Sequence, residues 1–69
     1  MVRVDSAAVS WDAQRKCWVI RLRVGEEVIK RTVPKVAHDT DDEILRSTAV
    51  KTAKDEGYEL DPTSVKVMR

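Results

Sequence analysis

The sequence predicts a small α+β protein, a two-layer β-β-β-α-β sandwich. An antiparallel three-stranded meander carries one helix on one face and a short C-terminal strand at its edge. Three observations predict this fold. Residues 17–24 alternate in polarity with the period of two of a half-buried strand, and residues 41–56 carry apolar side chains at helical spacing. Gly25 and Gly57 separate regular elements. The 69 residues provide material for one domain, residues 1–69.

The amino-acid composition argues against several classes of protein. With 42% apolar residues the chain is too apolar for a disordered protein. Its longest apolar run is four residues, 17–20, so we expect neither a membrane span nor a signal peptide. The single cysteine, Cys17, cannot form an internal disulfide, which favours a cytoplasmic location. One Cys and one His cannot build a four-ligand zinc site, and we expect no cofactor.

The first strand is predicted over residues 2–11. Its apolar residues change phase around residues 5–6, which predicts a bulge or a frayed start. The polar residues 12–16 then suit a hairpin loop. Because the chain has no Phe, we expect Trp11 and Trp18 to supply a large part of the core.

The second strand, residues 17–24, and the third, residues 28–33, are predicted to form a hairpin. Gly25 suits the first central position of a type II′ turn, and Pro34 closes the third strand. A two-residue turn predicts the following face toward the core, with Arg31 as a charged exception: Trp18, Ile20, Leu22, Ile29 and Val33. A three-residue turn would reverse the phase of the third strand, and both alternatives stay open.

A helix is predicted over residues 41–56, after a connector at residues 35–39. The run from Thr40 to Glu43 matches a capping box, and Gly57 suits the left-handed position that ends a helix.

The helix is predicted to be amphipathic, with an unusually small buried face. That face consists of Leu45, Ala49 and Ala53, whereas Val50 falls among the polar residues. After a turn at residues 61–62, residues 65–68 are predicted to form a last strand. It would run parallel to the first or third strand, at an edge.

Two groups of residues invite a chemical interpretation. His38 precedes a run of acidic residues at 39–43 that could ligate a metal, but an acid-rich helix start explains these carboxylates and no calcium-loop spacing is present. Cys17 is the only candidate nucleophile, and nothing in the sequence brings a base to it. We therefore expect no catalytic residue, no metal site and no enzymatic activity.

Charge is distributed unevenly along a chain whose net charge is +1. Residues 1–35 hold eight basic and four acidic residues, whereas residues 36–69 hold five basic and eight acidic ones. The meander is therefore basic and the helical half acidic. The face opposite the helix is the candidate interaction surface, and its residues are Val19, Arg21, Arg23, Val28, Lys30 and Thr32.

This surface has three interpretations: a solvated face, a protein-interaction surface, or a surface that follows nucleic-acid phosphates. We expect a non-catalytic protein-interaction module without a membrane partner. It would form a homodimer through the helix-free face or through an edge strand. The alternative is a nucleic-acid-binding domain that uses Arg21, Arg23, Lys30 and Arg31.

Overall fold

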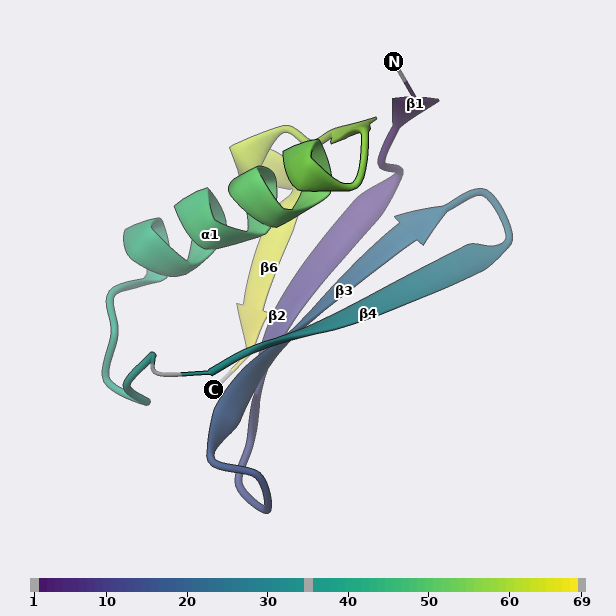
Figure 1. The fold of residues 1–69 in the computed structure, drawn as a ribbon. Coiled ribbons are helices and arrows are strands. Elements are labelled where there is room, and N and C mark those ends of the chain that lie inside the picture. The colour runs from purple at the N-terminus through teal and green to yellow at the C-terminus, as the bar shows by residue number, and fades with distance from the viewer. Residues whose placement is uncertain (1, 35, 69) are drawn as a thin grey trace.

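The computed structural model describes residues 2–34 and 36–68, and it confirms the predicted fold class (Figure 1). The predicted connector begins at Lys35, which lies outside the described residues. The elements, in chain order, are β1 (Val2–Arg3), β2 (Ser6–Asp12), β3 (Cys17–Val24), β4 (Glu27–Val33), α1 (Asp42–Asp55), β5 (Tyr58–Glu59), the short 3-10 helix η1 (Pro62–Ser64) and β6 (Val65–Met68).

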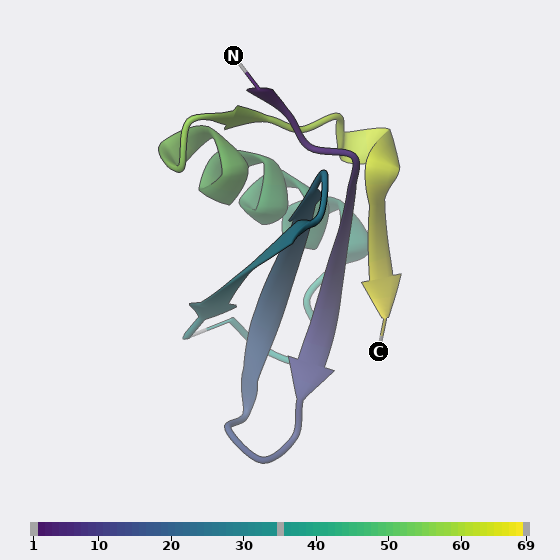
Figure 2. The same cartoon turned by 90° about the vertical axis from the view of Figure 1, so that its right-hand side faces the viewer.

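The main sheet has four strands in the order β4-β3-β2-β6. The strands β2, β3 and β4 form the predicted antiparallel meander, and β6 runs parallel to β2 at the edge of the sheet. Helix α1 lies across one face of this twisted sheet, as Figures 1 and 2 show from two directions. In the described part of the chain, no helix covers the opposite face.

The second hairpin has the two-residue turn of the first alternative. Val24 pairs with Glu27 across the turn, and Gly25 has a φ of 60°. Asp5 supports this turn, because its carboxylate accepts a hydrogen bond from the Gly25 backbone N–H at 2.7 Å. The register then continues to Trp18 opposite Val33, so the third strand has the predicted phase.

The core lies between the sheet and the helix. Its largest fully buried side chains are Trp18, Ile20, Leu22, Leu45 and Val9. Ala49 and Ala53 are fully buried as well, which confirms the small helix face. Trp11 contributes less than expected: it is half-buried, and its ring packs edge-on against Trp18 with centroids 5.4 Å apart.

Arg31 faces the helix side of the sheet at its periphery, opposite Ile20. Its Nε donates a hydrogen bond of 2.5 Å to the carboxylate of Glu56, the residue that caps the C-terminus of α1. This contact raises the pKa of Arg31 and lowers the pKa of Glu56. The charged exception of the core face is thus matched by a carboxylate 25 residues later.

The sequence predicted the C-terminal end of α1 correctly but not its N-terminal cap. The capping box is wrong, because Asp41 is the N-cap and its side chain makes no capping hydrogen bond. Thr40 instead belongs to the preceding turn, where its N–H donates to the Ala37 carbonyl at 3.2 Å, so the helix begins one residue later. Gly57 ends the helix with a φ of 86°, as predicted.

The predicted first strand is divided at the phase change. β1 pairs in parallel with β5, and the chain then crosses into the main sheet at β2. Val4 and Asp5 make the crossing with backbone hydrogen bonds to Glu59 and Arg23, each 2.8 Å long. The change of phase therefore marks a change of partner strand.

The helical projection placed Val50 among solvated polar residues, and this prediction is wrong. Val50 is partly buried against the core. The reason is the chain that follows the helix, which brings Tyr58 and Leu60 beside Val50.

A candidate anion-binding face

The helix-free face is built from alternate residues of the four strands. In β3, Trp18, Ile20 and Leu22 point into the core, so Arg21 and Arg23 point to the other side and are exposed. The register of β4 then places the remaining predicted residues on the same face. Val19 pairs with Thr32, Arg21 with Lys30 and Arg23 with Val28. All six residues of the predicted surface thus lie together.

The strands β2 and β6 extend this face beyond the meander. Ala8 lies between Arg21 of β3 and Lys66 of β6, so that Lys66, Ala8, Arg21 and Lys30 form one row across the four strands. Lys66 was not among the residues predicted for this surface. Its alternation with the buried Val65 could have indicated the face, but the neighbouring strand was not known.

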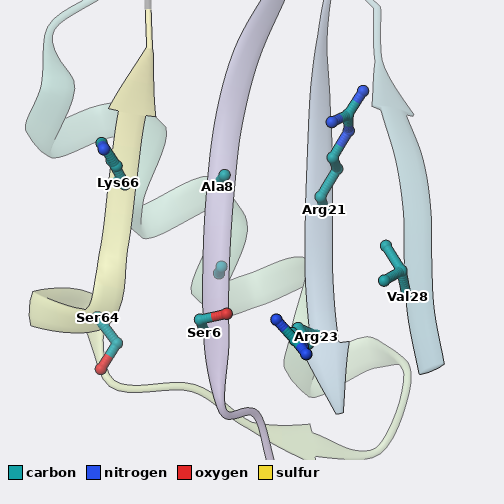
Figure 3. A pocket seen from close by; sticks show the side chains of 8 residues that line it. Ser6, Ala8, Arg21, Arg23, Val28, Ser64 and Lys66 are labelled. Carbon is teal, nitrogen blue, oxygen red and sulfur yellow. The ribbon is translucent and has the colours of Figure 1, made fainter. Parts of the chain in front are cut away.

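A shallow depression of about 500 Å³ lies on this face (Figure 3). Basic side chains stand on both sides of β2, whose own residues here are short. The depression is lined by Ser6, Ala7, Ala8, Arg21, Arg23, Val28, Ser64 and Lys66. The short side chains of β2 therefore form the floor between longer cationic ones.

The positive charge of this face is not compensated locally. The ion pairs found within residues 2–34 and 36–68 join Arg15 to Asp12 and Arg31 to Glu56, and neither involves a cation of this face. Among the residues that the structure describes, no carboxylate lines the depression. Arg21 and Lys30 are direct cross-strand partners, an arrangement of like charges that is mildly unfavourable in a sheet. The face thus carries a cluster of four cations without a carboxylate partner in these ion pairs: Arg21, Arg23, Lys30 and Lys66.

Arg31 does not belong to this cluster, which corrects the set of residues in the nucleic-acid alternative. It occupies the helix side of β4, between Lys30 and Thr32 of the opposite face. Its guanidinium is bound to Glu56, so its charge is already balanced.

The two other residues with a possible chemical role, His38 and Cys17, are part of the packed structure. His38 packs over the two tryptophans, with ring centroids 4.8 Å from Trp11 and 6.0 Å from Trp18. The Trp18 indole N–H donates to the Ala37 carbonyl at 2.9 Å, which holds this connector against the core. Cys17 is buried. Among the described residues, no group of three or more His, Cys, Asp or Glu side chains could hold a metal ion.

Comparison of the chain with protein-family models, with curated proteins and with solved structures finds no match. In the part of the chain that the structure describes, no helix has both the length and the apolar character that crossing a membrane requires.

Proposed function

We propose that this protein is a non-catalytic binding module whose helix-free face binds the phosphate backbone of a nucleic acid. The observation that carries the proposal is the cluster of four cations on this face. Three of them, Arg21, Arg23 and Lys66, line a recess to which no carboxylate of the described residues contributes. Phosphates attract such clusters through charge and through release of the counterions that surround a nucleic acid.

The spacing of the cations suits an extended polyanion better than a single small anion. Neighbouring strands lie about 4.8 Å apart, so Lys66 and Arg21, which are separated by β2, stand roughly 10 Å apart at the backbone. One phosphate cannot contact both residues without drawing their side chains together. Successive phosphates of a nucleic acid can contact several members of the cluster at once.

Charge also argues against self-association through this face, which the sequence had favoured. In a two-fold dimer the same patch of each copy faces the other. The four cations would then meet an identical set, with no carboxylate in the depression to balance them. Juxtaposed like charges at an interface are costly, so a polyanion is the better partner.

Association through an edge strand is a second candidate function, and one observation favours it. β4 has seven residues and, in the described chain, pairs with β3 on one side only. Its Val28 side chain is 56% exposed. An open strand edge can pair with a second copy. Sedimentation equilibrium tests this candidate, which predicts a mass above the 7.9 kDa of one chain.

The nucleic-acid proposal is tested by fluorescence anisotropy with labelled duplexes over a series of salt concentrations. We expect binding at about 50 mM salt that weakens steeply as salt rises. Lys66→Ala and Arg21→Ala should each weaken binding and reduce the slope of the salt dependence by about one.

Lys51→Ala is the matched control, because Lys51 is an exposed cation on α1 and not on the helix-free face. Its affinity and salt slope should equal those of the unmodified protein. The proposal fails if no nucleic acid binds at about 50 mM salt, where backbone contacts are strong. It also fails if Lys51→Ala weakens binding as much as Lys66→Ala does.

A further inference from the structure

We propose that the ligand is double-stranded B-form DNA, that the helix-free face lies over its major groove, and that Arg21 and Arg23 extend into the groove and contact guanine there. This inference rests on the proposed function and specifies the nucleic acid. It is carried by three features of the face: the absence of aromatic rings, its width, and the short side chains of β2 that lie beside both arginines.

The aromatic residues of the chain all lie away from the helix-free face. They are Trp11, Trp18 and Tyr58. Trp18 is fully buried, and the other two pack partly buried against the same core. Proteins that bind single strands stack bases on exposed aromatic rings, and each stacked base contributes about 1–3 kcal/mol. A face with cations and no ring is instead suited to a duplex, whose bases are already stacked.

The cationic row is wide enough to span the major groove of B-form DNA. Lys66 and Lys30 lie at the two ends of the row, on the two edge strands of the sheet. Three strand spacings separate them, which is about 14 Å at the backbone. The major groove is about 12 Å wide and the minor groove about 6 Å. The two lysines can therefore reach the phosphates on opposite sides of a major groove.

The middle of the face suits contact with base edges. Arg21 stands beside Ala8, and Arg23 stands beside Ser6, so short side chains accompany both arginines. These short residues allow the sheet to approach the groove while the guanidinium groups extend toward its floor. A guanidinium can donate two hydrogen bonds to O6 and N7 of guanine, the commonest base-specific contact in the major groove.

The same geometry excludes duplex RNA as the preferred ligand. The major groove of an A-form helix is deep and too narrow for protein side chains to read. The arginines of a sheet that lies over such a groove could not reach its base edges. Duplex RNA therefore keeps the phosphate contacts but loses those of the arginines.

The experiment compares four labelled ligands of equal length at one salt concentration: a DNA duplex containing G·C pairs, an A·T-only DNA duplex, an RNA duplex and a single DNA strand. We expect the G·C-containing duplex to bind about fivefold or more tightly than the other three, because each bidentate guanine contact contributes about 1–3 kcal/mol of discrimination.

Variants separate the two roles. Arg21→Lys keeps the charge and removes the two-pronged donor, so it should reduce the preference for G·C-containing DNA and leave binding to A·T-only DNA nearly unchanged. Lys66→Ala should weaken both DNA duplexes by the same factor. Circular dichroism confirms that each variant is folded.

The outcomes distinguish this inference from the proposed function. If the RNA duplex or the single strand binds as tightly as the G·C-containing duplex, the major-groove assignment is wrong, although phosphate binding stands. If Arg21→Lys weakens all four ligands equally, Arg21 contacts phosphate and the guanine assignment is wrong. If none of the four binds, the proposed function fails together with the inference.

Discussion

The two faces of the sheet differ more than any other two regions of this molecule, although the same strands make both. On β3, Trp18, Ile20 and Leu22 are completely buried under the helix, whereas Arg21 and Arg23 between them are exposed. The covered face provides the core. Most residues of the open face are exposed, so we expect their substitution to have little effect on folding.

Small side chains occur on both faces, with opposite consequences. Ala49 and Ala53 of α1 allow the helix to lie close to the sheet, and both are fully buried. Ser6 and Ala8 of β2 have no covering element, and they form the floor of the depression. A short residue therefore closes a gap where a second layer is present and leaves a recess where it is absent.

The largest effect expected is on the covered face. Trp18→Ala should lower the free energy of unfolding by about 3–5 kcal/mol, because it leaves a large cavity. It also removes the indole hydrogen bond to Ala37. Leu22→Ala should lower the free energy of unfolding by about 2–5 kcal/mol. It provides the measurement if the tryptophan variant does not fold.

Urea denaturation measures both losses, with Arg21→Ala from the same strand as the control. Being exposed, Arg21 should change stability by no more than about 0.5 kcal/mol when truncated. A neutral Leu22→Ala together with a destabilised Arg21→Ala would reverse the assignment of the two faces.

A smaller effect is expected where the helix that covers one face ends. Gly57 has a φ of 86°, and a Cβ added there would meet no atom within 4 Å. Gly57→Ala should therefore cost about 1–2 kcal/mol through backbone strain alone. Gly57→Asn should cost less, since Asn tolerates this conformation, and the urea midpoints of the two variants check the order. Equal stability of Gly57→Ala and the unmodified protein would contradict this explanation.

The smallest effect concerns carboxylates at the rim of the covered face. The hydrogen bond from Arg31 lowers the pKa of Glu56, and hydrogen bonds from the Thr63 N–H and hydroxyl lower the pKa of Asp61. A depressed folded pKa stabilises the protein above the unfolded values of about 4.3 for Glu and 3.9 for Asp. This stabilisation is lost as the pH falls through the lower folded values.

The urea midpoint should accordingly decrease as the solution is acidified below about pH 5. Glu56→Gln should make this decrease shallower, and Arg31→Gln should have the same effect because it removes the same hydrogen bond. If either substitution leaves the acid dependence unchanged, the Arg31–Glu56 pair does not persist in solution.

Much of the candidate site was predictable because it depends on local patterns. The alternation along residues 17–24 separates Arg21 from Leu22, and the Gly25 turn sets which residue of β4 lies opposite each residue of β3. Lys66 was not predictable in this way. It joins the face only because β6 returns to lie beside β2, and nothing in residues 65–68 specifies that neighbour.

Neighbours along the chain thus suffice to determine periodicity, turn geometry and the small apolar side of the helix, since these depend on backbone sterics and side-chain spacing over a few residues. Contacts between distant segments require the assembled core. The crossing from β1 to β2, the partial burial of Val50 and the balancing of Arg31 by Glu56 are of this kind. Each depends on where hydrophobic burial brings a remote part of the chain, and a local pattern carries no information about that position.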